Sequence, residues 1–343
     1  MKASRDLLKE AFNLTRSRFP ALAATTLSLE DPSHPVIAER IKYIYDNTVF
    51  GGKHSRARLA LDTYDAIKPT SDPDQRLLVA QTAVAIEMLQ AYFLVLDDIV
   101  DGSETRRGQP CWFRRPDVGI TAINDALLLE VFMDEVIIDA LKNHPNLSRI
   151  HDAFRKSKRT TVVGQNLDSH LERNFDAFTW ERYEAMVLHK TADYTIWLPT
   201  QLGVLAADAC FDMEMAKNLC YRTGFLFQAQ DDFLDVYGEP KVTGKVGTDI
   251  QEGKCTWLSV RAMQLLDKKP NGRREFENLY GKSEPPTVEA IRDIYGSLKL
   301  KDEFERFECT YSKELITDLE KFSFAPVRTV LLELLNRIIG RKK

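Results

Sequence analysis

Two acidic segments of the sequence, DDIVD at residues 97–101 and DDFLD at 231–235, each end a long apolar run. Aspartates four residues apart share one face of an α-helix, so the first and last aspartates of each segment point the same way. A buried ionised carboxylate is costly unless positive charge matches it. Carboxylate-only sites favour Mg²⁺ or Ca²⁺, and Mg²⁺ typically completes its shell with water and substrate phosphates. The two segments therefore predict a diphosphate held by metal ions.

The residues around these segments argue against two simpler interpretations. A single DxxxD pair is more often a solvated helix face, but the preceding MLQAYFLVL and GFLFQAQ are too apolar for a surface helix. A calcium-binding EF-hand loop needs an acidic third residue and a glycine as the sixth. The third residues here are Ile99 and Phe233, and Val236 is the sixth residue of the second segment. We therefore expect neither a solvated face nor a calcium sensor.

Cations that could bind a diphosphate stand near both acidic segments. The motif GGKHSR places two cations three residues apart at the start of a predicted helix, where the helix dipole favours anions. Lys53 is followed by His54 and not by Ser or Thr, which excludes a P-loop. Any one of these cations could instead be a solvated side chain or form an ion pair with an aspartate. A lysine within an apolar helix could also extend its amine to solvent. The candidates are Lys53, Arg56, Arg106, Arg107, Lys190, Lys245 and Lys254.

The composition bounds the class of protein. The 343 residues are 44% hydrophobic and carry a net charge of -4, which gives no general attraction to nucleic acid or to an anionic membrane. The first residues, with Asp6 and Glu10, read as an amphipathic helix and not as a targeting peptide. No run approaches the roughly 18 apolar residues of a membrane span, and the scattered cysteines indicate reduced thiols. We expect a cytoplasmic protein that binds no nucleic acid and does not insert stably into a membrane.

Helical periodicity dominates the chain, and strand-like alternation is almost absent. No flexible linker divides the sequence, so we predict a single domain over residues 1–343, an all-α bundle of ten or more helices. In such a bundle sites form on facing helices, and the two acidic segments would jointly hold a cluster of Mg²⁺ if they face each other. The predicted helices span residues 4–18, 35–48, 54–67, 74–101, 119–143, 147–174, 178–205, 211–237, 254–267, 286–298 and 310–339.

A set of motifs covering nearly the whole chain resembles the trans-isoprenyl diphosphate synthase family. In order, they are GGKHSR, LQAYFLVLDDIVD, TRRGQPCW, AINDALLLE, GQNLD, HKTADY, FQAQDDFLD and VTGKVGTDIQEGKCTWL. The resemblance implies the isoprenoid synthase fold, a homodimer and three Mg²⁺ ions. It also implies a prenyltransferase of isoprenoid and lipid biosynthesis, which condenses isopentenyl diphosphate with dimethylallyl and geranyl diphosphate to give farnesyl diphosphate and diphosphate.

The resemblance also implies roles for individual residues. The metal ligands would be Asp97, Asp101 and Asp231, supported directly or through water by Asp98, Asp232 and Asp235. The allylic diphosphate would be bound by Arg106, Lys190 and Lys254, and isopentenyl diphosphate by Lys53, Arg56, Gln90 and Arg107. Oxygens facing the developing allylic cation would come from Thr191 and Gln228, near Tyr194, while Lys245 would approach from its loop. The catalytic set would therefore be Arg106, Lys190, Thr191 and Gln228.

The sequence departs from the family pattern at a few positions. Asp193 stands where the family usually has an aromatic residue, Ala57 replaces a common Gly, and Gly102 follows the first acidic segment where Ser is frequent. The local shape around Lys190 and Thr191 is most affected by Asp193. Basic residues close the family's chains near the active site, so residues 341–343 could cap it or form a frayed tail.

The residues before the first acidic segment predict the product length. Tyr92 and Phe93 precede Asp97 by five and four residues on one apolar helix. At about 1.5 Å rise per residue, their rings begin roughly 6 to 8 Å below the metal site. An aromatic pair in an apolar helix is usually ordinary core, but its position and its match to fifteen-carbon synthases predict a floor that stops the growing chain.

Other functions remain open at this stage. A geranyl or geranylgeranyl diphosphate synthase would share all these motifs. A catalytically silent partner subunit of another prenyltransferase would usually have lost acidic or basic motif residues, which all stand here. A terpene cyclase shares the fold, but DDFLD and GGKHSR count against it, because it needs no second diphosphate site.

Overall fold

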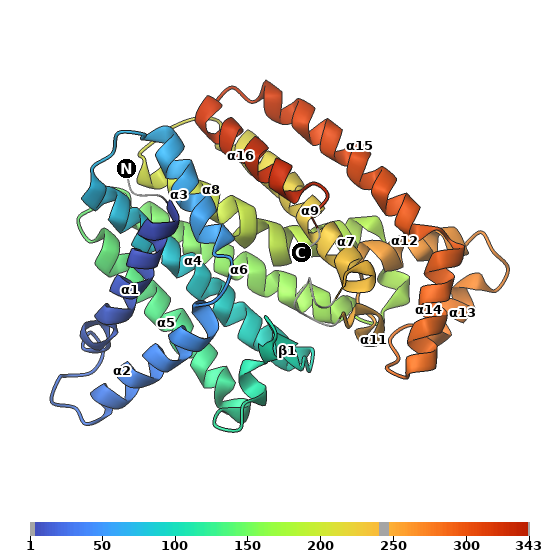
Figure 1. Ribbon diagram of the computed structural model, residues 1–343, viewed down its shortest axis with the longest axis horizontal. Coiled ribbons are helices and arrows are strands. Elements are labelled where there is room, and N and C mark those ends of the chain that lie inside the picture. The colour runs from blue at the N-terminus through green and yellow to red at the C-terminus, as the bar shows by residue number, and fades with distance from the viewer. Residues whose placement is uncertain (1–3, 240–246, 342–343) are drawn as a thin grey trace. The chain divides into compact units, whose positions relative to one another are not determined.

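The structure is a computed structural model that describes residues 4–239 and 247–341. Within these residues the chain is almost entirely helical, and a single two-stranded pair supplies the strands (Figure 1). It forms two compact units, one from residues 4–158 with 198–211 and the other from the rest of the described chain. The prediction of an all-α fold with ten or more helices is confirmed, and the single domain over residues 1–343 stays a prediction.

The first unit is built around α4 (Pro73–Val100), which α1, α3 and α5 pack against. Pro73 opens α4, and the Asp72 side chain caps it by accepting the Asp74 N–H at 2.8 Å. By length and composition α4 could cross a membrane, but 78% of its most apolar window is buried, as expected of a core helix. The other helices of this unit are α1 (Ser4–Ala23), α2 (Ser33–Ile44), the π-helix η1 (Tyr45–Val49), α3 (Ser55–Ile67), η2 (Trp112–Arg114), η3 (Gly119–Thr121), α5 (Ala122–Leu141) and α8 (Leu198–Ala206).

A tight hairpin follows α4 and carries both arginines of the TRRG motif. Its strands β1 (Thr105–Arg106) and β2 (Gln109–Pro110) are antiparallel, with Arg106 opposite Gln109. The two turn residues, Arg107 and Gly108, have φ of 54° and 75°, the positive values that the commonest two-residue hairpin turn requires. The sequence pattern did not predict this hairpin, because strands of two residues show no alternation.

In the second unit, the π-helix η5 (Leu188–Trp197) lies against two glycines. A Cβ on Gly224 of α9 (Met213–Tyr237) would lie 2.4 Å from the Cβ of Ala192. A Cβ on Gly164 of α6 (Leu147–Leu171) would lie 2.1 Å from the backbone nitrogen of Lys190. Glycine at both positions therefore lets η5 approach its neighbours closely. The other helices are η4 (Phe175–Ala177), α7 (Trp180–Val187), α11 (Asp249–Glu252), α12 (Trp257–Leu266), α13 (Gly272–Leu279), α14 (Pro285–Ser297), α15 (Leu300–Lys321) and α16 (Ala325–Ile338).

Two predicted helices are divided in the structure. The segment predicted at 178–205 consists of α7, η5 and α8 in direct succession, and the apolar pattern did not distinguish the π-helical stretch from the α-helices on either side. The segment predicted at 310–339 is the end of α15 followed by α16, where Pro326 lies in the first turn of the new helix.

Candidate active site

The first acidic segment forms the end of α4. The Asp101 N–H donates to the Asp97 carbonyl at 2.9 Å, so the two carboxylates follow one another by a single helical turn. Asp97 is half-buried, whereas Asp98 is 3% exposed. Asp97 and Asp101 therefore offer oxygen ligands of the kind that Mg²⁺ prefers.

Arg106 lies against this acidic segment. Its Nε and Nη2 donate to Asp98 Oδ1 at 3.0 and 2.5 Å, and Nη2 lies 3.9 Å from Asp97 Oδ2. Burial alone would lower the pKa of Arg106, but the hydrogen bonds and charge of Asp98 outweigh it and raise that pKa. Arg106 thus places a permanent positive charge beside Asp97.

Arg107 points toward the GGKHSR segment instead. Its Nη1 donates to the Thr48 carbonyl at 3.2 Å, and a Cβ on Gly52 would lie 2.9 Å from its Nη2. Partial desolvation lowers the pKa of Arg107, and the charges of Arg106 and Arg56 lower it further. The arginines of the two motifs therefore lie within electrostatic reach of one another.

Two of the remaining residues predicted to bind isopentenyl diphosphate lie at the start of α3, and the third lies on α4. Lys53 is exposed in the loop before the helix, and Arg56, in the first turn, is 8% exposed. Gln90 is half-buried on α4, which packs against α3. The helix N-terminus adds its own partial positive charge to these cations.

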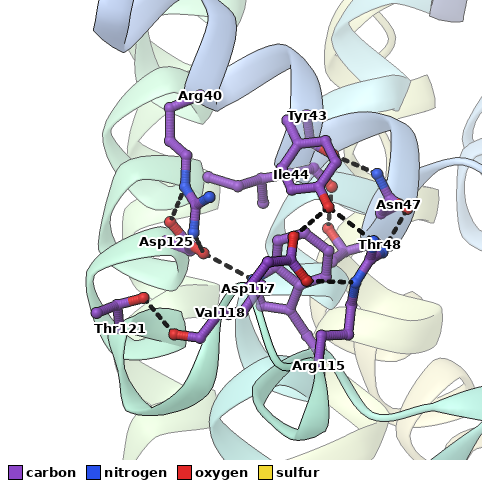
Figure 2. A network of polar contacts seen from close by, with 11 residues as sticks. Arg40, Tyr43, Ile44, Asn47, Thr48, Arg115, Asp117, Val118, Thr121 and Asp125 are labelled. Atoms are coloured by element: carbon purple, nitrogen blue, oxygen red, sulfur yellow. Dashed lines mark hydrogen bonds and ion pairs between the residues drawn. The ribbon is translucent and has the colours of Figure 1, made fainter.

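A polar network joins α2 and η1 to the segment that follows the hairpin and to α5 (Figure 2). The buried Asp125 of α5 accepts two hydrogen bonds from Arg40, at 2.8 and 2.5 Å, and one from Trp112 Nε1 at 2.7 Å. Arg115 donates to the Asn47 side chain at 2.7 Å. The chain that follows Arg106 and Arg107 is thus tied to η1 through Arg115 and to α5 through Trp112, and Asp125 joins this region to α2.

The predicted floor residues lie on α4 as expected. The rings of Tyr92 and Phe93 have centroids 4.8 Å apart, and Phe93 is 4% exposed. Burial raises the pKa of Tyr92, so its phenol stays protonated at neutral pH. The two side chains form a bulky aromatic step one to two turns before Asp97.

The second acidic segment lies on α9, and Asp232 is its innermost member. Asp232 accepts hydrogen bonds from the Tyr183 hydroxyl at 2.6 Å and from Trp257 N–H and Gln228 Nε2, both at 2.8 Å. Burial raises the pKa of Asp232 to about 6, against the effect of these donors. Asp232 therefore ties α7 and α12 to α9, beside the more exposed Asp231.

A carboxylate that the sequence analysis did not select, Asp168 of the GQNLD motif, holds two of the predicted lysines. Its Oδ2 accepts from Lys190 Nζ at 2.7 Å and from Lys254 Nζ at 3.0 Å. Asp168 and Lys254 are each 6% exposed. Asp168 Oδ2 thus brings together two ammonium groups that lie 64 residues apart in sequence (254 − 190). Without this negative charge the two ammonium groups would repel each other.

For the prenyltransferase activity that the family resemblance implies, we predict that Asp168→Asn lowers kcat/KM for the allylic diphosphate by about 10- to 100-fold, because a small displacement of binding groups can cost about 10² in rate. Steady-state kinetics with geranyl diphosphate as the varied substrate measure this effect. The control is Asp152→Asn, which removes an exposed ion pair with Lys156 on the same helix and should leave kcat/KM within about twofold. Equal values for the two variants would contradict the role given to Asp168.

Thr191 and Gln228, predicted to face the allylic cation, contact each other. The Thr191 hydroxyl donates to Gln228 Oε1 at 2.7 Å, and Gln228 Nε2 in turn donates to Asp232. Thr191 and Tyr194 are both buried, at 6% and 8% exposure. This chain of hydrogen bonds fixes the Gln228 amide orientation and links η5 to the second acidic segment.

Asp193, the main departure from the family pattern, is matched by a tyrosine. The Tyr221 hydroxyl donates to Asp193 Oδ2 at 2.6 Å, and the carboxyl group is 5% exposed. Burial, aided by the charge of Asp193, raises the pKa of Tyr221. Tyr221 of α9 thus satisfies one oxygen of this buried carboxyl group, whereas Asp193 Oδ1 is buried without a hydrogen-bond partner among the described residues.

We predict that Tyr221→Phe destabilises the fold by about 1 to 3 kcal/mol, since it leaves a buried carboxylate without its donor. Thermal or urea denaturation would show the loss, and adding Asp193→Asn should recover part of it. Tyr237→Phe on the same helix is the matched control. Additive losses in the double variant would mean that the two side chains act independently.

Arg341 reaches the second acidic segment from the end of the described chain. It forms an ion pair with Asp231, and it donates to the Phe227 carbonyl at 2.8 Å and to Gln230 Oε1 at 2.9 Å. Its guanidinium also lies 4.0 Å from the Phe227 ring centroid. Arg341 therefore contacts the second acidic segment, and its role as a cap of the active site stays a prediction. Lys342, Lys343 and Lys245 lie outside the described residues.

The carboxylates predicted to bind metal ions are only partly arranged as a metal site. Over residues 4–239 and 247–341, no three Asp, Glu, His or Cys side chains are gathered as a metal shell, and Asp98 and Asp231 are engaged by arginines. The carboxylates of Asp97 and Asp101 nevertheless fit a hard divalent cation in type and spacing. The participation of all six aspartates stays a prediction.

Comparisons with known proteins give matches over most of the chain. A family model described as polyprenyl synthetase matches residues 36–298. Farnesyl diphosphate synthase 1 of Artemisia spiciformis is 36% identical over 309 residues, 88% of this chain and 89% of that protein. Farnesyl pyrophosphate synthase of Rattus norvegicus is 36% identical over 328 residues, 92% of each chain. The T. brucei farnesyl diphosphate synthase complexed with a bisphosphonate superposes with a TM-score of 0.90 at 29% identity, covering 99% of this chain and 100% of that one.

Proposed function

Because this chain belongs to the polyprenyl synthetase family, we propose that it is a Mg²⁺-dependent prenyltransferase that makes farnesyl diphosphate. The substrates are isopentenyl diphosphate and, in turn, dimethylallyl and geranyl diphosphate. The observation that carries the proposal is the end of α4, where Asp97 and Asp101 stand beside Arg106 and above the aromatic pair Tyr92 and Phe93. This one helix combines oxygen ligands, a cation for diphosphate and a limit to chain length.

The allylic diphosphate is assigned to Arg106, Lys190 and Lys254. Their charges stabilise the negative charge that develops on the departing diphosphate as the carbon–oxygen bond breaks. Mg²⁺, which we propose to be held in three ions by the aspartates of the two acidic segments, would neutralise the same leaving group. Asp168 keeps Lys190 and Lys254 at a fixed spacing, so little reorganisation is needed when charge develops.

The carbon chemistry requires few protein groups. The oxygens of Thr191 and Gln228 are proposed to face the allylic cation, which the double bond of isopentenyl diphosphate attacks to form the new carbon–carbon bond. Lys53, Arg56, Gln90 and Arg107 hold the diphosphate of this second substrate. The proton lost from the adduct passes to the released diphosphate.

Product analysis tests the function. The protein is incubated with Mg²⁺, isopentenyl diphosphate and either dimethylallyl or geranyl diphosphate, and the products are separated by length. Farnesyl diphosphate from both primers is expected. A ten- or twenty-carbon main product would identify a geranyl or geranylgeranyl synthase, and no elongation with either primer would identify a silent partner subunit.

We also propose a homodimer. The exposed face of α5 carries Ile123, Leu127, Val131 and Ile138, all at least 40% exposed. Their spacing of four and seven residues forms one apolar stripe, which a second copy of the chain would cover. Sedimentation velocity would detect the dimer, and Leu127→Asp should dissociate it.

A cytoplasmic location without stable membrane insertion or nucleic-acid binding is proposed as well. The five cysteines, all of which lie in the described residues, form no disulfide bond, as expected in a reducing compartment. They are Cys111, Cys210, Cys220, Cys255 and Cys309. The net charge of -4 supports the absence of nucleic-acid binding.

A further inference from the structure

One buried carboxylate of α4 has no part in the function described so far. Glu87 is 3% exposed and lies three residues before Gln90. Its Oε1 accepts the backbone N–H of Ala57 at 2.9 Å. Ala57 directly follows Arg56, so this hydrogen bond joins the core helix to the first turn of α3.

The hydrogen bond replaces a local helix cap. The residue that precedes α3, His54, has a φ of 49° and makes no side-chain cap hydrogen bond. The first N–H groups of a helix have no partner within the helix, and a carboxylate is the best acceptor at this positive end. Glu87 supplies that acceptor from a neighbouring helix, and therefore fixes where α3 begins.

The charge of Glu87 also balances nearby cations. Burial lowers the pKa of His54, and desolvation lowers the pKa of Arg107, while Glu87 opposes both effects. Arg56 is 8% exposed, and Arg107 packs on Gly52 of the same segment. The buried carboxylate of Glu87 thus lies within electrostatic reach of His54 and Arg107, near the proposed diphosphate site.

We propose that Glu87 is a positioning residue for isopentenyl diphosphate, acting through the start of α3 and its cations. The inference rests on the proposed function and assigns Glu87 no contact with substrate. Fixing the first turn of α3 sets the direction of Arg56 and of the loop that bears Lys53. Glu87 also offsets the mutual repulsion of the arginines before the anion binds.

The test compares Glu87→Gln with Glu87→Asp. Gln keeps the size and one acceptor oxygen but removes the charge, whereas Asp keeps the charge on a shorter side chain. We expect Glu87→Gln to raise KM for isopentenyl diphosphate at least about tenfold while KM for geranyl diphosphate changes less than about twofold, in line with helix-end charge effects in buried positions. Glu87→Asp should give an intermediate KM for isopentenyl diphosphate.

A control variant and measurements of stability distinguish a positioning role of Glu87 from a purely structural one. Glu39→Gln removes an exposed carboxylate of α2, paired with Lys42, and should leave both KM values unchanged. Melting temperatures measured on the same samples separate stability from binding. An equal rise in both KM values, or lower stability with unchanged KM values, would reduce Glu87 to a structural role. If Glu87→Gln does not fold, the Glu87→Asp values decide. Absence of any elongation by the wild-type protein would instead refute the proposed function.

Discussion

The double variant Asp97→Ala/Asp101→Ala is expected to lower kcat by at least about 10³-fold. Removing both carboxylates takes away the oxygen ligands at the end of α4, where a divalent cation would stabilise the leaving diphosphate by several kcal/mol. A loss of about 4 kcal/mol in transition-state stabilisation corresponds to about 10³ in rate. Steady-state product formation at saturating Mg²⁺ measures the effect.

The matched control for this variant lies on the same helix. Asp74→Ala removes an exposed carboxylate from the first turn of α4 and should leave kcat within about twofold. Titration with Mn²⁺, followed by electron paramagnetic resonance, should show weaker metal binding in the double variant and unchanged binding in Asp74→Ala. Full activity of the double variant would exclude a catalytic role for the first acidic segment.

Small side chains at positions 92 and 93 are expected to change the product. In Tyr92→Ala and Tyr92→Ala/Phe93→Ser, the aromatic step before Asp97 is removed, so that the growing chain passes the fifteen-carbon limit. The main product should become twenty carbons or longer, as measured by chromatography of the dephosphorylated alcohols. Truncating the buried Phe93 should also cost about 3 to 5 kcal/mol of stability.

Variants of Tyr92 alone separate the effect on product length from the effect on stability, because Tyr92 is only half-buried. Tyr92→Phe keeps the ring and should leave farnesyl diphosphate as the main product, while Tyr92→Ala shifts the distribution by itself. The same fifteen-carbon product from all these variants would refute the floor assignment and place the limit elsewhere in the chain.

The sequence was most informative where periodicity and motif spacing carry the signal. The helical pattern predicted the all-α fold and the course of α4 and α9, because their apolar faces repeat regularly. Motif spacing also predicted that Arg106 would lie by the first acidic segment, and this contact is present. The family resemblance assigned Thr191 and Gln228 to one site, and their side chains contact each other. The contact of Arg106 with Asp98 was open to prediction because the two residues are only 8 apart in sequence.

Features that depend on distant residues could not be predicted. The role of Asp168 requires Lys190 and Lys254, which lie 22 and 86 residues further along the chain. Glu87 was hidden within an apolar run, where a single carboxylate gives no pattern. The compensation of Asp193 by Tyr221 likewise depends on how η5 packs on α9. Such pairs arise from tertiary packing, which no local pattern encodes.

The ion pair between Arg341 and Asp231 has a consequence for handling the protein. In solutions that contain chelator, the guanidinium still serves as a counterion for Asp231, which offsets part of its repulsion with the other carboxylates of α9. Dialysis against EDTA should therefore yield a folded apoprotein that regains activity when Mg²⁺ is restored. Preparations stripped of metal during purification need not be discarded as denatured.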